Sequence, residues 1–154
     1  MKDRKVKSIF KQGPIAPEFI AESLKKHQTK TKIGAHAMFM GQIREDETEK
    51  GKVCSMVYTA YEEMANELMH EIREEVFERF DLHCMHVYHS LGEVQTGELC
   101  LFVFVSSGHR KASFEACEYL VEEIKRKLPI FGKEIYENQE HAWKRNQFPE
   151  NTME

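Results

Sequence analysis

A strand, a tight turn and the start of a helix follow one another directly between residues 99 and 128. Leu99 to Val105 reads LCLFVFV, which is apolar enough for a central strand. Ser106-Ser107-Gly108-His109-Arg110 forms the turn, and the amphipathic pattern from Lys111 to Leu128 predicts a long helix. The first N–H groups of a helix lack partners and carry partial positive charge, so this junction is suited to an anion. His109 and Arg110 add side-chain donors there.

The rest of the chain predicts further alternation of strands and helices. Strands are expected at 6–10, 33–43, 53–61, 83–91 and 130–136, and helices at 17–27 and 62–80. A charged loop without periodicity is expected at 45–52. The order predicts an α+β fold with an antiparallel or mixed sheet and helices packed on one side. We expect a single domain over residues 1–146 and a disordered tail at 147–154.

Composition excludes several classes of function. A chain of 154 residues fits one domain, and its net charge of -4 argues against a nucleic-acid binder. No apolar stretch is long enough to span a membrane and no signal peptide is evident, so we expect a cytoplasmic protein. The four cysteines are scattered without a CxxC pair, which predicts buried, reduced thiols.

Two other groups of residues invite a chemical interpretation. Lys125 follows the apolar Ile124 and so borders the buried stripe of its helix, where a lysine can act as nucleophile or proton carrier. The helix dipole alone also explains cations in a last turn. The histidines near Cys84 suggest a metal, but strand alternation leaves no single face with three ligands, so no metal site is expected.

The length of the last helix constrains how these groups can cooperate. Fifteen residues separate Arg110 from Lys125, which corresponds to about 22 Å of helix. One small-molecule pocket cannot contact both ends. If both ends serve chemistry, the expected arrangement is a symmetric dimer in which one subunit completes the other's site.

Five motifs, read together, resemble the large, catalytic subunit of molybdopterin synthase. They are GAHAMFMGQIR, YTAYE, HSLGEV, SSGHR and IKRKLPIFGKE, and they are followed by Trp143. The resemblance extends from Ile33 to Trp143. It implies an α/β hammerhead fold, a homodimer and a small ubiquitin-like partner subunit docked at each end. It also implies sulfur transfer from the partner's C-terminal Gly-Gly thiocarboxylate to cyclic pyranopterin monophosphate, which gives the dithiolene of molybdopterin. No cofactor of the protein's own is expected.

The resemblance also implies roles for individual residues. Lys125 and Lys133 would be catalytic, and the contacts to the anionic substrate would come from Arg44, His109, Arg110, Lys144 and Arg145. One position departs from the family pattern, because Gly132 stands where a functional lysine is usual. Either a one-residue adjustment brings Lys133 into the pocket, or one catalytic lysine is missing.

Three functions stay open at this stage. The first is the sulfur-transferring enzyme. The second is a non-catalytic homologue that binds the partner's Gly-Gly tail but does not turn over. The third is a generic binder of phosphate ligands.

Overall fold

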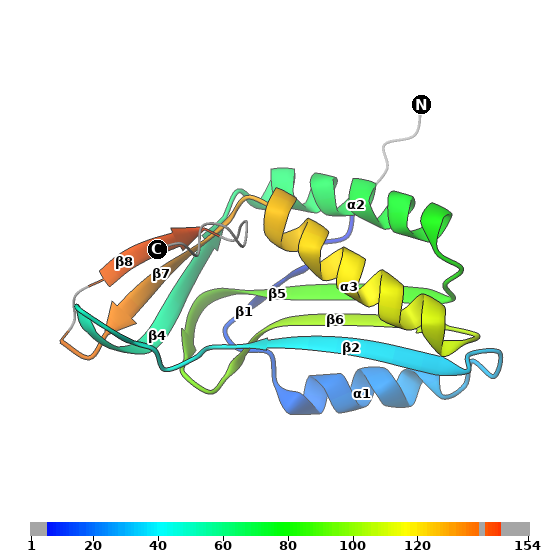
Figure 1. Cartoon of the computed structure of the whole chain (residues 1–154), viewed down its shortest axis with the longest axis horizontal. Coiled ribbons are helices and arrows are strands. Elements are labelled where there is room, and N and C mark those ends of the chain that lie inside the picture. The colour runs from blue at the N-terminus through cyan, green and yellow to red at the C-terminus, as the bar shows by residue number, and fades with distance from the viewer. Residues whose placement is uncertain (1–5, 139–140, 146–154) are drawn as a thin grey trace.

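An eight-stranded sheet organises the chain, which we describe from a computed structural model (Figure 1). The structure describes residues 6–138 and the backbone of 141–145. The helices are α1 (Pro17–His27), α2 (Glu62–Arg79) and α3 (Arg110–Lys127). The strands are β1 (Phe10–Gln12), β2 (Ala35–Gln42), β3 (Glu47–Thr48), β4 (Gly51–Ala60), β5 (Cys84–Gln95), β6 (Leu99–Ser107), β7 (Ile130–Tyr136) and β8 (His141–Arg145).

Strand β5 joins two parts of the sheet. The strand order is β2-β6-β5-β4-β7-β8, with β1 beside β5 and β3 beside β4. Residues 84–89 of β5 pair with β6, and residues 92–95 pair with β4. Gly92 begins the second segment at a φ of 85°, a conformation that side chains disfavour. Strands β4, β7 and β8 therefore form an extension set apart from β2 and β6 at the left of Figure 1.

Strand β6 separates two hydrophobic cores. Val103 and Val105 face the larger core, to which α2 and α3 contribute. Phe102 and Phe104 face a smaller core together with Phe19 of α1. Because successive side chains of a strand point to opposite faces, a wholly apolar β6 needs cover on both sides.

The α+β class expected from the sequence is confirmed. Helices α2 and α3 lie on one side of the sheet, whereas α1 covers the opposite face, so the expectation that the helices pack on one side is wrong for α1 (Figure 1). The sheet is mixed, because β1 pairs with β5 in parallel and the other strand pairs are antiparallel.

Several element boundaries differ from the sequence-based expectations. The expected loop at 45–52 contains β3, which pairs with the start of β4 in a hairpin. Gly51 permits this turn with a φ of 116°. Strand β1 begins at Phe10, where the predicted strand ends, and β8 was not predicted. The predicted tail at 147–154 lies outside the described residues.

Three of the four cysteines are buried, as expected from composition. All four cysteines are free thiols, with Cys84, Cys100 and Cys117 buried and Cys54 half-buried. Among the described residues, no helix combines the length and apolarity needed to cross a membrane.

The smaller core predicts a difference between two phenylalanines. Phe104 is fully buried between α1 and the sheet, whereas Phe114 on α3 is 65% exposed. Phe104→Ala is expected to lower the free energy of unfolding by about 3–5 kcal/mol because it leaves a cavity. Phe114→Ala, the matched control, is expected to change it by less than about 0.5 kcal/mol. Urea denaturation of both variants measures the difference, and equal losses would contradict this account of the core.

Candidate functional site

The Ser106–Arg110 turn presents two side-chain hydrogen-bond donors at the start of α3. His109 is the N-cap residue, and both His109 and Arg110 are exposed. The Ser107 hydroxyl lies 2.5 Å from the His109 carbonyl oxygen and 2.5 Å from the Ser113 hydroxyl. These hydrogen bonds of Ser107 hold the turn against the first turn of α3. The exposed donors beside the helix N-terminus keep the anion-binding interpretation open.

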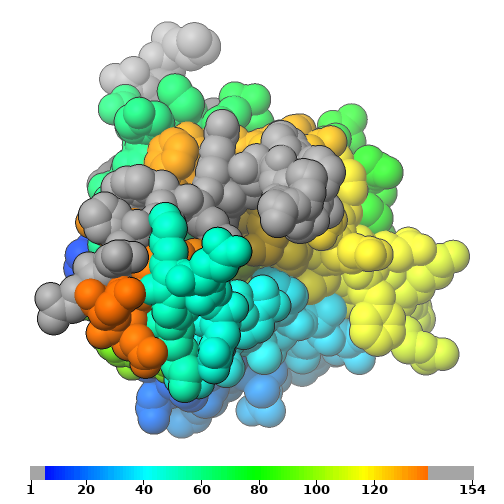
Figure 2. Space-filling view, turned by 60° about the vertical axis from the view of Figure 1, so that its left-hand side comes forward, coloured from blue at the N-terminus to red at the C-terminus, as the bar shows by residue number. Residues whose placement is uncertain are grey.

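Lys125 lies at the other end of the same helix. Helix α3 runs without interruption from Arg110 to Lys127, so about 22 Å separates Arg110 from Lys125. Figure 2 shows the region around the start of α3 (yellow) projecting on the side opposite β7 (orange). Within one chain, His109 and Arg110 therefore do not meet Lys125.

The last-turn cations of α3 divide into two groups. Arg126 and Lys127 both pair with the carboxylate of Glu123, which is 3% exposed. Lys125 is half-buried, and its charge acts instead on His89 and Cys100. Lys125 therefore differs from the next two cations of the helix, whose charges are paired with Glu123.

Three buried side chains, together with Lys125, are called the Lys125 cluster: His89 and Cys100, on which the Lys125 charge acts, and Tyr58, which contacts both. The ring centroids of Tyr58 and His89 lie 4.9 Å apart. The Tyr58 hydroxyl donates to Cys100 Sγ over 3.5 Å, and His89 Nδ1 lies 2.8 Å from the Ser90 carbonyl oxygen, its natural acceptor. The three side chains come from β4, β5 and β6, so the junction of the two sheet parts builds this site.

Burial keeps the neighbours of Lys125 uncharged. It lowers the pKa of His89 to about 4, and the Lys125 charge adds to that effect. Burial also raises the pKa of the Cys100 thiol and, most strongly, the pKa of Tyr58. At neutral pH the half-buried Lys125 therefore acts on neutral groups, and a charge near the protein interior has a stronger field on a nearby anion than it has in bulk water.

Gly132 and Lys133 lie on opposite faces of β7. Gly132 pairs with Tyr58 and Lys133 pairs with Val57, and the β4–β7 register is regular at these residues. An added Cβ at Gly132 would meet Met56 Sδ at 2.9 Å and Tyr58 Cε1 at 3.1 Å. Gly132 therefore faces the Tyr58 side, and strand alternation places Lys133 on the other side. Which of the two alternatives considered for Lys133 applies stays a prediction.

The remaining predicted cations lie around the extension formed by β4, β7 and β8. Arg44 has a side chain that is 80% exposed and pairs with Asp46 at 2.6 Å. This hydrogen bond raises the pKa of Arg44, and the charge of Glu134 on β7 adds a smaller effect. Lys144 and Arg145 lie on β8, opposite Gly132 and Phe131. The side chains of 144 and 145 lie outside the described residues, so their roles stay predictions.

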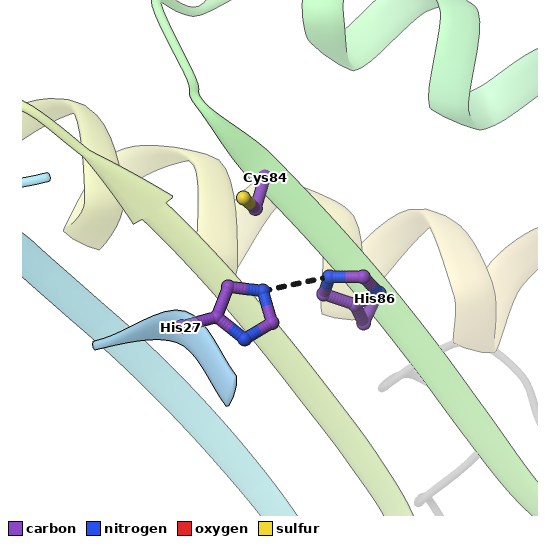
Figure 3. A group of neighbouring side chains, drawn as sticks. All are labelled: His27, Cys84 and His86. Atoms are coloured by element: carbon purple, nitrogen blue, oxygen red, sulfur yellow. Dashed lines mark hydrogen bonds between the residues drawn. The ribbon is translucent and has the colours of Figure 1, made fainter. Parts of the chain in front are cut away.

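A second group of side chains lies on the α1 side of the sheet. His27, Cys84 and His86 each offer one ligand atom, and these atoms all lie within 4.8 Å of one another (Figure 3). Cys84 and His86 share one face of β5, as strand alternation predicted. The third member, His27, comes from the end of α1. The sequence argument considered the residues of one strand only and therefore missed His27. Three possible metal ligands do lie together on this face of the sheet.

Tyr58, His89 and Cys100 were also not assigned as site residues from the sequence. Two of them lie in motifs that carry the family resemblance, Tyr58 in YTAYE and His89 in HSLGEV. These motifs drew attention to Tyr58 and His89, but the positions of the two residues in the sequence do not indicate that either lies near Lys125. Their proximity depends on the β4–β5–β6 pairing.

Comparisons with known proteins agree with the sequence resemblance. Residues 12–127 match the family model described as MoaE protein. A molybdopterin synthase catalytic subunit from Pyrococcus abyssi is 38% identical over 102 residues, which cover 66% of this chain and 68% of that protein. The corresponding protein of Rattus norvegicus is 39% identical over 113 residues, 73% of this chain. The chain spans 56% of the rat protein's length.

Solved structures show the same fold. Molybdopterin synthase from Staphylococcus aureus has a TM-score of 0.77 and 29% identity, with coverage of 89% of this chain and 96% of that chain. A complex of subunits 1 and 2 of the molybdopterin-converting factor from Helicobacter pylori has a TM-score of 0.72. Its 19% identity, with coverage of 93% of this chain and 92% of that chain, supports the fold alone. Because the family model matches 12–127, well over half of the sequence, the chain belongs to the MoaE protein family.

Proposed function

We propose that this chain is the catalytic subunit of a molybdopterin synthase. It transfers sulfur from the C-terminal thiocarboxylate of a small ubiquitin-like partner subunit to cyclic pyranopterin monophosphate, and the product is the dithiolene of molybdopterin. The observation that carries the proposal is the family match over residues 12–127. The setting of Lys125, half-buried among neutral groups at the sheet junction, supports it.

Lys125 is the residue we assign to the chemistry. The reaction brings an anionic sulfur and a phosphate-bearing substrate together, and charge moves as the sulfur attacks. A fixed ammonium group in a site of low hydration stabilises such charge without solvent reorganisation. We assign Tyr58, His89 and Cys100 as positioning residues, because they form a buried, neutral group on which the Lys125 charge acts.

The substrate's negative charge requires further cations. We assign Arg44, His109 and Arg110 to this contact, together with Lys144 and Arg145, because guanidinium groups bind phosphates bidentately. Arg44 is already influenced by the charge of Glu134 on β7. His109 and Arg110 lie at the far end of α3 from Lys125 and reach a common substrate through a second copy of the chain.

The proposed assembly is a homodimer that binds one partner subunit at each end. The Helicobacter pylori chain that shares this fold belongs to a complex of subunits 1 and 2 of molybdopterin-converting factor. The partner's flexible Gly-Gly terminus would reach the Lys125 cluster. We place the protein in the cytoplasm, where its four free thiols persist in the reduced state.

A non-catalytic homologue is the second candidate function, and one observation favours it. Gly132 occupies the position of a family lysine, and Lys133 lies on the other face of β7. A chain of this kind would bind the partner's tail but release no product.

Replacement of Lys125 tests the leading proposal. Lys125→Ala is expected to reduce molybdopterin formation by at least about 100-fold, because it removes a charge that stabilises the transition state. The assay supplies cyclic pyranopterin monophosphate and thiocarboxylated partner to the purified chain. Lys26→Ala, at an exposed lysine of α1, is the control and should retain full activity. Retained activity in Lys125→Ala would refute the role given to this lysine.

Mixing two inactive variants tests whether two chains share each site. Lys125→Ala and Arg110→Ala homodimers are unfolded and refolded together, so that the subunits exchange at random. If each site takes Lys125 from one chain and Arg110 from the other, half of the dimers regain one intact site, and activity returns to about a quarter of wild type. Each variant refolded alone should stay inactive. A mixture that stays inactive would contradict the shared site.

Lys133 separates the enzyme from the non-catalytic homologue. The family resemblance predicts that Lys133→Ala strongly reduces product formation while partner binding persists. The measurement pairs the sulfur-transfer assay with calorimetric binding of the partner. A silent Lys133→Ala variant in an active protein would show that this lysine has no catalytic part. A wild-type chain that binds the partner but makes no product would establish the second candidate.

A further inference from the structure

The His27–Cys84–His86 cluster has the composition of a metal-binding site. It holds two imidazoles and one thiol, and their ligand atoms lie within 4.8 Å of one another. His27 and Cys84 are buried, and His86 is half-buried. Figure 3 shows the ring of His27, from the end of α1, directed at the ring of His86 on β5, with the sulfur of Cys84 beside them. The cluster lies on the opposite face of the sheet from the Lys125 cluster.

A backbone carbonyl orients His27 as a ligand. His27 Nδ1 lies 2.7 Å from the carbonyl oxygen of Ser23, an atom that only accepts hydrogen bonds. Nδ1 therefore carries the proton, and the lone pair of the neutral ring is on Nε2. That Nε2 atom faces His86 Nε2 at 3.0 Å. A carbonyl that fixes the tautomer of a histidine in this way is the usual outer-shell partner of a metal-bound imidazole.

The spacing of the ligand atoms suits a small tetrahedral ion. Zn–N bonds of 2.0–2.1 Å place two tetrahedral nitrogens about 3.3 Å apart. The observed separation of the two Nε2 atoms is 3.0 Å, so a small rotation of either ring admits the ion. With Zn–S bonds of about 2.3 Å, each S···N edge is about 3.6 Å. No two ligand atoms of the cluster lie more than 4.8 Å apart. The Cys84 sulfur would therefore move by about 1 Å at most to reach this S···N distance.

The surroundings provide an outer contact for the sulfur and a route for the ion. Lys30 Nζ donates to Cys84 Sγ at 3.2 Å, and a thiolate bound to a metal keeps lone pairs for such a bond. His86 also lines a cavity of about 300 Å³ between residues 6–9, α2 and β5. The cavity reaches the cluster on the His86 side, because His86 is the ligand that lines it.

We propose that His27, Cys84 and His86 bind one Zn²⁺ ion, with a water molecule as the fourth ligand. Mixed nitrogen and sulfur ligands in a tetrahedral arrangement favour zinc among the divalent ions. Binding converts the Cys84 thiol to a thiolate and releases its proton to solvent. The ion links the end of α1 to β5, and 56 residues lie between His27 and Cys84 in the sequence, so its main effect is on stability.

Titration of the untagged full chain with Zn²⁺ against a chromophoric chelator tests the site. One equivalent per chain is expected to bind, and the melting temperature should rise with zinc concentration. Co²⁺ in place of zinc should give a sulfur-to-cobalt charge-transfer band. Cys84→Ser should abolish this band and weaken zinc binding by more than the roughly 10–100-fold that the loss of an outer-shell partner causes. His27→Gln should weaken binding to a similar degree.

Matched controls are available on the same chain. Cys54→Ser removes another free cysteine and His83→Gln removes an exposed histidine next to the site, and both should bind zinc as wild type does. X-ray absorption of the zinc-loaded wild-type chain requires no variant and should show one sulfur and two imidazole nitrogens. Less than one equivalent bound, a shell without sulfur, or an unchanged band in Cys84→Ser would overturn the proposal.

Discussion

The burial of β6 on both faces is the constraint on which the rest of the structure depends. Phe102 and Phe104 require cover on one side and Val103 and Val105 on the other, and all four are fully buried. The chain meets this requirement with α1 on one face and α2 and α3 on the other. Each covered face of the sheet also carries a candidate site. The Lys125 cluster lies on the α3 side, and the His27–Cys84–His86 cluster lies under α1.

The rigidity of α3 decides how the proposed active site is assembled. The helix is straight enough in Figure 1 to keep its two ends apart, and its exposed start and half-buried end carry different chemical groups. A flexible connection would allow both ends to fold onto one substrate within a chain. An uninterrupted helix does not, so the cations at its start serve a site on a second copy, or none.

Much of the fold could be predicted from the sequence, because hydrophobic periodicity is local. The predicted strand 130–136 matches β7 at both ends, and α1 matches the predicted 17–27. Pairing between distant strands is not local, which explains why β3 and the contact between His27 and His86 were not predicted. The charged segment 45–52 has no alternating pattern, yet the ladder with β4 makes β3 from it. His27 and His86 likewise meet only because the end of α1 packs against the sheet beside β5. Their positions in the sequence do not indicate this contact.

Strand alternation on β7 determines which face of the sheet carries Gly132 and which carries Lys133. On β7, the residues that share the face of Gly132 are Ile130 and Glu134, both buried, and the pairing with Tyr58 fixes that face toward the Lys125 cluster. A shift of one residue would bring Lys133 to this face, but it would also turn Ile130 and Glu134 out of the interior. The loss of their buried contacts opposes such a shift. If Lys133 takes part in the reaction, it therefore acts from the opposite face of the extension, on a group that arrives from outside this chain's own Lys125 cluster.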